Sequence, residues 1–300
     1  MNRVLLIGGT GFVGQHLSNV FDKTDEILTT GSDVNVRDRK LLSSLIKKFS
    51  PDQVVYLASI TTLRESFASP EATIDITLLG LLRTLEILAE VGFRGRLLNI
   101  SSSEVYGDVG EVFLPITEVT PTQPRSPYAV AKRASEILCD QWSQSSNFEI
   151  LSARPFNHIG PRQSDRFAIS NFAKQITLIK NRAIPPKLFV GNIDVKRDFT
   201  DVRDVVKAYK SLLSGDFKSS VYNICSGSEY SVRFLIEKMC EIMDIELDLI
   251  VDKEKIRAGE QDRILGDPTR INLEFGWKAR IPIEKTLEDI LLFWSSRVRI

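Results

Sequence analysis

The sequence predicts an α/β fold built on a parallel β-sheet that helices cover on both faces. Short runs of consecutive apolar residues recur along the chain, and most are followed by a segment whose apolar residues have helical spacing. Strands that are apolar on both sides are typical of parallel sheets buried between layers of helices. A chain of 300 residues is long enough for one large domain or two unequal lobes.

The strands and helices are assigned in order along the chain. Continuous apolar character marks the strands, which are expected at residues 3–9, 26–30, 53–59, 95–101 and 148–156. Helical spacing marks the helices, which are expected at residues 12–21, 37–49, 73–92, 126–142, 168–180, 201–213, 232–243 and 283–298. Ser126 is placed as the N-cap of its helix, with Pro127 at the first helical position. Residues 157–167 have the character of a loop.

Charge and composition exclude several classes of partner. Lys and Arg together number 39, as do Asp and Glu, so the net charge is zero. A partner that is a nucleic acid or an anionic membrane would favour a basic excess. No apolar run approaches the ~20 residues that span a bilayer, and the 2 histidines and 3 scattered cysteines form no metal-ligand pattern. We therefore expect a cytoplasmic, metal-free globular protein.

A glycine-rich turn follows the first strand. Gly8, Gly11 and Gly14 are spaced G-x-x-G-x-x-G between a strand and a helix. Glycines at this place permit a tight turn and let a pyrophosphate approach the backbone at the positive end of the helix. The turn predicts dinucleotide binding and hence a Rossmann, doubly wound sheet.

The choice between NAD and NADP stays open. An acid that binds the ribose hydroxyls of NAD is usual at the end of the second strand, but here Thr29, Thr30, Gly31 and Ser32 precede Asp33. Lys23 and Arg37 are candidates for binding a 2′-phosphate, although neither has a convincing position.

Tyr128 and Lys132 form a second motif, Y-x-x-x-K. Residues separated by four positions lie one turn apart on the same face of a helix. A tyrosine has a pKa near 10 and serves as an acid or base at neutral pH only when its anion is stabilised. A lysine ammonium and a nicotinamide cation nearby would both lower that pKa.

These motifs, in this order, resemble the extended short-chain dehydrogenase/reductase superfamily. The segment "SSSEVYG" resembles the serine/threonine segment of that group, and "SPYAVAK" its active-site helix. The resemblance implies that Ser102, four residues before Tyr106, is the catalytic hydroxyl. It further implies that Tyr128 transfers the proton to or from the sugar oxygen. Lys132 would hold the nicotinamide ribose, and Glu104 would complete the catalytic set.

The resemblance also implies a wider cofactor site. Its residues are Gly8, Gly11, Phe12, Val13, Gly14, Asn35, Val36, Leu57, Ala58, Ser59, Thr77, Tyr128, Lys132 and Pro155. Relatives usually carry Asn, which helps to arrange the lysine, where this chain has Thr77, so the network around Lys132 is expected to differ. Asn35 stands where an acid commonly meets the adenine amine, and its amide oxygen can accept the same bond.

The second half of the chain narrows the substrate. "ARPFNHIGPRQSDRFAISNFAKQI", "VGNIDVKRDFTDVRDVVKAY" and "VYNICSG" resemble the bacterial GDP-6-deoxy-4-keto-mannose reductases, which make GDP-rhamnose, a precursor for polysaccharide biosynthesis. The implied substrate residues are Ser102, Ser103, Glu104, Tyr128, Asn157, Arg197, Arg257 and Glu260. An arginine fork can bind two phosphate oxygens at once. We expect a nucleotide-binding domain at 1–155 and a smaller, mixed α/β substrate-binding lobe at 156–300, interleaved with segments that return to the sheet.

The expected reaction is NAD(P)H-dependent reduction of the C4 keto group of a GDP-4-keto-6-deoxy-hexose. Alternatives are a 4,6-dehydratase of GDP-mannose or a GDP-heptose, in which Glu104 would help to remove water, and a 4-keto reductase or dehydrogenase that acts on a GDP-heptose. Intact Ser102, Tyr128 and Lys132 argue against a non-catalytic nucleotide-binding regulator.

Relatives pair their subunits through two helices each, so a homodimer with a four-helix contact is expected. The two helices would lie at about residues 72–91 and 127–143. On the second, Ala131, Ala134, Leu138 and Trp142 form an apolar stripe suited to close packing.

Overall fold

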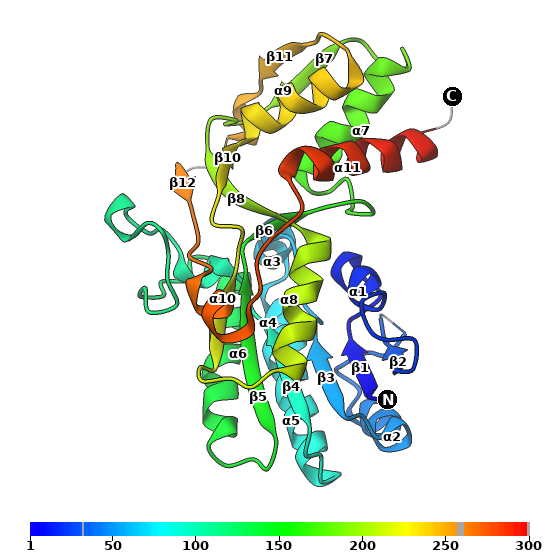
Figure 1. Cartoon of the computed structure of the whole chain (residues 1–300), viewed down its shortest axis with the longest axis vertical. Coiled ribbons are helices and arrows are strands. Elements are labelled where there is room, and N and C mark those ends of the chain that lie inside the picture. Colours follow the sequence, from blue (N-terminus) through cyan, green and yellow to red (C-terminus); the bar gives the residue numbers. More distant parts are fainter. Residues whose placement is uncertain (32, 257–260, 299–300) are drawn as a thin grey trace.

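A six-stranded parallel sheet forms the centre of the larger lobe (Figure 1). The computed structural model describes residues 1–31, 33–256 and 261–298. The strand order is β2-β1-β3-β4-β5-β9, and every neighbouring pair is parallel. The strands are β1 (Arg3–Ile7), β2 (Glu26–Thr29), β3 (Gln53–Tyr56), β4 (Arg96–Ile100), β5 (Glu149–Pro155) and β9 (Val221–Ile224). The predicted α/β class is confirmed.

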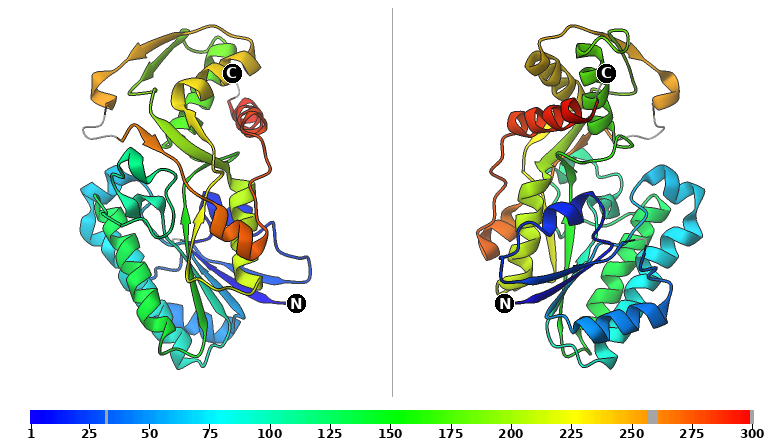
Figure 2. Two further views of the ribbon diagram at one scale, coloured as in Figure 1. Left: turned by 60° about the vertical axis from the view of Figure 1, so that its left-hand side comes forward. Right: turned by 90° about the vertical axis from the view of Figure 1, so that its right-hand side faces the viewer.

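Helices cover this sheet on both faces, as the side views of Figure 2 show. On one face lie α1 (Phe12–Leu17), α8 (Val202–Ser214) and α10 (Thr269–Phe275), whose apolar side chains share a buried cluster with β1, β4 and β5. On the other face lie α2 (Arg39–Phe49), α5 (Gly80–Glu90) and α6 (Pro127–Ser143). Burial on both faces explains why the strands are apolar throughout.

The smaller lobe has a core of its own. It contains strands of two small sheets, which are β6 (Asn157–Ile159), β7 (Lys187–Val190), β8 (Lys196–Asp201), β10 (Glu229–Ser231), β11 (Asp248–Val251) and β12 (Arg263–Ile264). The helices α7 (Ala168–Lys180), α9 (Val232–Met243) and α11 (Ile283–Arg297) pack together over them. In Figure 1 this lobe stands above the carboxyl ends of the large sheet.

The chain passes between the lobes more than once. Strand β5 leads up into β6, and α8 and β9 return from the smaller lobe to the large sheet. After α10 the chain enters the smaller lobe again and forms α11. The lobes are therefore joined by several segments instead of one linker.

Two segments differ from the sequence prediction because contacts distant in the chain decide them. Residues 157–159, expected in a loop, form β6, which pairs with β8. The helix expected at 73–92 is divided into α4 (Pro70–Ile74), a π-helical turn η1 (Asp75–Leu79) and α5. The Tyr56 hydroxyl donates to the Ile76 carbonyl at 2.6 Å, so that carbonyl has a partner outside the helix. A π turn of this kind is often found at functional sites.

Helix α6 begins as predicted, but its apolar stripe faces inward. The Ser126 hydroxyl accepts from the Ala129 amide at 3.1 Å, which confirms the N-cap. Ala131 is 1% exposed. Leu138 and Trp142 pack against the buried cluster beneath α2 and α5. Ala131, Leu138 and Trp142 therefore pack at least partly within the subunit, and the expectation that the stripe packs between subunits stays a prediction.

The remaining short helices lie in the connections. They are α3 (Leu63–Ala68), which precedes α4, and the single turns η2 (Ser103–Tyr106), η3 (Glu111–Phe113) and η4 (Lys253–Lys255). Among the described residues, no helix is long and apolar enough to cross a membrane. In the same part of the chain, no group of His, Cys, Asp and Glu is arranged to hold a metal ion.

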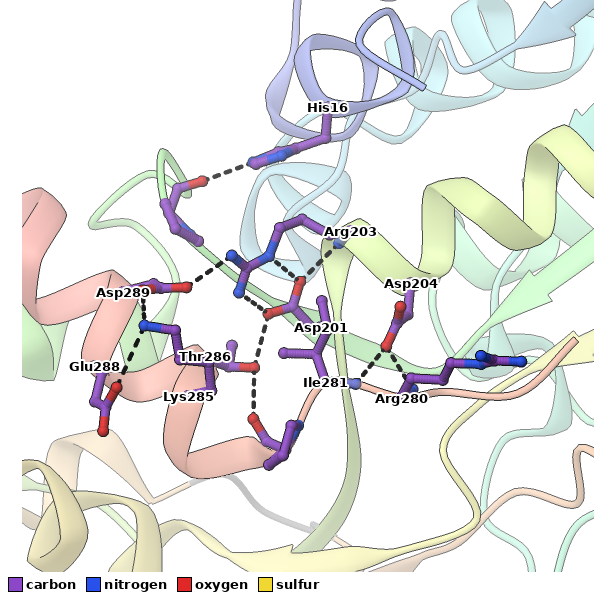
Figure 3. A network of polar contacts seen from close by, with 12 residues as sticks. His16, Asp201, Arg203, Asp204, Arg280, Ile281, Lys285, Thr286, Glu288 and Asp289 are labelled. Carbon is purple, nitrogen blue, oxygen red and sulfur yellow. Dashed lines mark hydrogen bonds and ion pairs between the residues drawn. The ribbon is translucent and has the colours of Figure 1, made fainter. Parts of the chain in front are cut away.

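A buried polar junction fixes the smaller lobe to α8 (Figure 3). Asp201 ends β8 and caps α8 by accepting from the Arg203 amide at 2.7 Å. Its carboxylate also accepts from the Arg203 guanidinium and from the Thr286 hydroxyl of α11, each at 2.7 Å. Arg203 reaches Asp289 of α11 at 2.7 Å. One carboxylate thus ties β8, α8 and α11 together.

Asp204, one residue further along α8, holds the segment that leads to α11. Its carboxylate accepts from the amides of Arg280 and Ile281 at 2.6 and 2.7 Å (Figure 3). The residue is 1% exposed. Its ion-pair partner Lys207 is in contrast half exposed.

We predict that Asp204→Ala lowers the free energy of unfolding by about 2–4 kcal/mol, because two partly buried amides lose their buried acceptor. Lys207→Ala should change it by less than about 0.5 kcal/mol, because the lysine end of the pair faces solvent. The shift of the urea midpoint measures both effects. Equal shifts for the two variants would contradict the claim that Asp204 stabilises the fold through its bonds to the backbone amides and not through its ion pair with Lys207.

Candidate active site

The side chains of the predicted catalytic set gather at the carboxyl end of β4. Ser102 follows β4 and starts the turn η2, where its hydroxyl accepts from the Glu104 amide at 3.2 Å. The Ser102 side chain also lies close to Tyr128, where it acts to lower the pKa of the phenol. Open parallel sheets place their ligands at these strand ends. The structure therefore brings Ser102 and Tyr128 together although they lie in different elements.

Helix α6 carries Tyr128 and Lys132 on one face. The ammonium of Lys132 lies 5.7 Å from the centre of the Tyr128 ring. It donates to the Ile100 carbonyl at 2.6 Å. Lys132 is 2% exposed. The lysine thus joins α6 to the last residue of β4, next to the serine segment.

Burial dominates the electrostatics of this pair. It raises the pKa of Tyr128 to about 12, with a smaller contribution in the same direction from Glu104; the Ser102 side chain acts against it. Burial lowers the pKa of Lys132 to about 7, and the negative charge of Glu136 acts against that change. With burial as the largest influence, the phenol holds its proton at neutral pH. The lowering of this pKa expected from a nicotinamide cation stays a prediction.

The glycines after β1 form a tight loop with one open face. Gly8 has φ +80°, and a Cβ atom there would lie 2.6 Å from the backbone of Ala58. A Cβ atom at Gly14 would lie 2.0 Å from the Gly9 carbonyl oxygen. At Gly11, the N-cap of α1, the nearest atom would be 3.9 Å away. Gly8 and Gly14 are thus required by packing, whereas Gly11 leaves room in front of the first helical amides, which suits a dinucleotide phosphate.

Phe12 and Val13 begin α1 and are partly buried against its core cluster. In the loop between β2 and α2, Asn35 accepts from the Arg37 amide at 3.0 Å, and Val36 is 5% exposed. Arg37, a candidate for a 2′-phosphate, pairs with Asp75 at 2.9 Å. The Asp33 carboxylate accepts from the Gly31 amide at 2.8 Å, while Lys23 is exposed.

The residues after β3 connect the glycine loop to η1. Ala58 packs on Gly8, and the amide of Leu57 donates to the Ile7 carbonyl. The hydroxyls of Ser59 and Thr77 are 3.0 Å apart. Ser135 of α6 donates to the Thr77 carbonyl at 3.3 Å. Thr77, the predicted departure from the family pattern, therefore bridges the strand end and the catalytic helix.

The residues predicted to bind substrate come from both lobes. Ser103 is partly buried and Glu104 is exposed in η2. After β5, whose last residue Pro155 is buried, Asn157 lies exposed at the start of β6. The remaining three are arginine and glutamate side chains. Arg197 in the neighbouring strand β8 donates to the Lys196 and Asp262 carbonyls at 2.8 and 3.3 Å, whereas Arg257 and Glu260 lie outside the described residues.

Sequence reasoning missed a buried carboxylate beside this site. Glu136 lies one helical turn beyond Lys132, is fully buried and accepts from the Ser101 hydroxyl at 2.5 Å. The available signal was the spacing, because Tyr128, Lys132 and Glu136 recur every four residues on one face of α6.

Comparisons with known proteins agree with this geometry. The sequence profile of a family described as GDP-mannose 4,6 dehydratase matches residues 22–290. A GDP-6-deoxy-D-mannose reductase of Pseudomonas aeruginosa is 42% identical over 300 residues, covering 99% of this chain and 98% of that protein. A GDP-mannose 4,6-dehydratase of Vibrio cholerae is 28% identical, covering 86% of this chain and 76% of that protein.

Solved structures show the same fold. The structure of RMD from Pseudomonas aeruginosa complexed with NADPH has a TM-score of 0.93 at 42% identity, covering 99% of this chain and all of that one. A UDP-glucose 4-epimerase of Thermotoga maritima has a TM-score of 0.87 at 21% identity over 99% of this chain and all of that one, a likeness that concerns the fold.

A pair of glycine variants tests the loop. We predict that Gly8→Ala lowers the free energy of unfolding by about 1–3 kcal/mol, because the positive φ and the contact with Ala58 both strain the loop. Gly11→Ala should leave unfolding unchanged but weaken NADPH binding about 10-fold by filling the open face. Thermal unfolding without nucleotide and fluorescence titration with NADPH measure the two effects. Normal NADPH binding by Gly11→Ala would exclude this face as the phosphate site.

Proposed function

The chain belongs to the GDP-mannose 4,6-dehydratase family, and we propose that it reduces the C4 keto group of a GDP-4-keto-6-deoxy-hexose with NADPH or NADH. The observation that carries this proposal is the 42% identity to a GDP-6-deoxy-D-mannose reductase along 99% of the chain. The juxtaposed Ser102, Tyr128 and Lys132 support it, because they supply the groups that a carbonyl reduction needs. The resemblance found in the sequence is thereby confirmed at the level of the family.

In this proposal Tyr128 is the proton donor. NAD(P)H, when bound, supplies the hydride that adds to C4, and the developing oxyanion must be protonated. Burial holds the pKa of Tyr128 at about 12, so the phenol is protonated at neutral pH, the form that a reductase needs before turnover. The Ser102 hydroxyl, which lies close to Tyr128, would hydrogen-bond the same sugar oxygen.

Lys132 and the residues between the lobes complete the proposed site. The Lys132 ammonium would hold the nicotinamide ribose and stabilise the tyrosinate that remains after proton transfer. Asn157 and Arg197 would contact the diphosphate of the GDP portion, where an arginine can bind two phosphate oxygens. Arg257 and Glu260 would face the nucleotide. Ser103 and Glu104 would orient the hexose. The structure of RMD with NADPH favours NADPH as the first cofactor to test.

A 4,6-dehydratase is the competing proposal. The family carries the name of that activity, and Glu104 lies in η2 beside Ser102, where it could help to remove water across C5 and C6. The dehydratases compared are 28% identical or less and align with 86% of this chain, against 42% and 99% for the reductase. We therefore assign Glu104 to substrate orientation. The same chemistry on a GDP-heptose remains an alternative, and it would use the same residues.

We also propose that two chains form a homodimer through helices of the larger lobe. Helices α3, α4 and α6 and the turn η1 pack side by side. Large apolar side chains are exposed on these elements, and they are Phe67, Ile74, Leu79, Val130 and Ile137. Apolar groups gathered on neighbouring helices favour a second copy that offers the same surface. Val130 and Ile137 would form the contact on α6.

The proposal also covers the division of the chain and the compartment in which the protein works. We assign nucleotide binding to residues 1–155 and GDP-sugar binding to 156–300, with α8, β9 and α10 returning to the first unit. Cys139, Cys225 and Cys240 are unpaired thiols, which fits a reducing compartment such as the cytoplasm.

The reaction can be tested with purified protein. We predict that NADPH is consumed with GDP-4-keto-6-deoxy-mannose but not with GDP-mannose, and that Tyr128→Phe lowers kcat about 10²–10⁴-fold. Tyr230→Phe is the matched control, because Tyr230 stacks on Phe234 in the smaller lobe. Turnover of GDP-mannose without added reductant would replace the reductase with the dehydratase.

The dimer is tested by mass measurement in solution. Ile137→Glu should shift the molar mass from two chains to one, because a buried, unpaired carboxylate opposes the contact. Leu273→Glu on α10, an exposed leucine outside the proposed surface, should leave the mass unchanged. Multi-angle light scattering after gel filtration decides between them. A dimer that survives Ile137→Glu would exclude this surface.

A further inference from the structure

A buried cluster of charges surrounds Glu136 behind the catalytic side chains. The carboxylate is fully buried. One oxygen accepts from the Ser101 hydroxyl at 2.5 Å and from the Arg154 Nε at 2.8 Å. The other accepts from a terminal nitrogen of Arg154 at 2.8 Å and from Arg133 at 2.9 Å. Both oxygens are therefore engaged in hydrogen bonds, three of them from arginine side chains.

Arg154 depends on this carboxylate. Its side chain is 4% exposed, and its other terminal nitrogen donates to the Tyr106 hydroxyl at 2.9 Å. Tyr106 donates in turn to Asn223 of β9 at 2.6 Å. Without Glu136, a buried guanidinium would face like charges on α6 with no compensating anion. Glu136 thus joins α6 to β5 and, through Tyr106, to β9.

The same carboxylate lies next to the residues on either side of the proposed site, Ser101 and Lys132. Ser101, its partner, directly precedes Ser102, and the Ser101 amide is fixed by the Ala153 carbonyl at 2.7 Å. Lys132 lies one turn before Glu136 on the same face of α6. Glu136 therefore acts on Ser101 through a hydrogen bond and on Lys132 through its charge.

We propose that Glu136 is a positioning residue for the reduction: its carboxylate anchors the strand end that carries Ser102 and supplies the buried negative charge opposite the Lys132 ammonium. The proposal deepens the reductase function proposed above and rests on it for its turnover measurements. It assigns no contact between Glu136 and the substrate or the cofactor.

The direction of the pH effect follows from the charges. Burial lowers the pKa of Lys132 to about 7 and Glu136 raises it, so removal of the negative charge should let Lys132 lose its proton at lower pH. Other titratable or charged groups surround the pair, and they are Tyr128, Arg133 and Cys139 on α6, Glu104 and Tyr106 on η2, Arg154 on β5 and Tyr209 on α8. All of these remain in a Glu136→Gln variant.

Glu136→Gln separates the charge from the shape of the side chain. We expect kcat to fall about 10- to 100-fold with little change in KM for the GDP sugar. The alkaline limb of the kcat profile should move to lower pH by about one unit. NADPH affinity, measured by fluorescence between pH 6 and 9 without sugar, should lose strength at a correspondingly lower pH.

Two further variants keep the test decisive. Ser101→Ala removes the hydrogen bond and leaves the charge, so kcat should fall while the pH limb stays in place. Glu274→Gln neutralises a carboxylate on α10 that accepts from Tyr222, Ser219 and Lys218. It should lower the melting temperature without moving either profile. If Glu136→Gln fails to fold, the Ser101→Ala result tests the anchoring claim.

The proposal is overturned if Glu136→Gln changes the melting temperature alone, as Glu274→Gln does, and both pH profiles remain in place. An unchanged kcat in Ser101→Ala would remove the anchoring role. If the wild-type protein reduces no GDP-4-keto sugar, the proposed function fails, whereas the pH dependence of NADPH binding still measures the charge effect of Glu136.

Discussion

The hydrogen bond from the Lys132 ammonium to the Ile100 carbonyl, 2.6 Å long, is the contact on which the arrangement of the site depends. It crosses from α6 to the last residue of β4, and so fixes Tyr128 relative to Ser102. The parallel sheet makes this possible because the ends of β1, β3, β4 and β5 all open toward the smaller lobe. A lysine buried to this extent must have charged and polar partners, and Glu136 and the strand carbonyl provide them.

Burial shifts the pKa values of the two members of the motif in opposite directions. It favours the neutral phenol of Tyr128 and the neutral amine of Lys132, because each charged form loses its hydration. A protonated tyrosine suits proton donation to a carbonyl oxygen, whereas the lysine needs its charge to hold the ribose and the later tyrosinate. The cluster of Glu136, Arg154 and Ser101 is the feature that reconciles these requirements, since its carboxylate acts on Lys132 from one turn away.

Local signals predicted the parts of the structure that depend on neighbours in the chain. Ser126 and Pro127 predicted the start of α6, and the glycine spacing predicted the turn after β1. Contacts between distant residues decided the rest: β6 needs β8, and the π turn at Ile76 has the Tyr56 hydroxyl as an outside partner. The roles of Ser102, Tyr128 and Lys132 remain predictions, although the structure brings these side chains together.

The central claim, that this site adds hydrogen to C4 of a GDP-4-keto sugar, is tested most directly by following an isotopic label. NADPH deuterated at the transferred position of the nicotinamide ring is incubated with the protein and GDP-4-keto-6-deoxy-mannose, and the product is analysed by NMR. The account predicts deuterium on C4 of the hexose, in an amount equal to the NADPH consumed. A product without deuterium on C4, or with the label on C6, would contradict it.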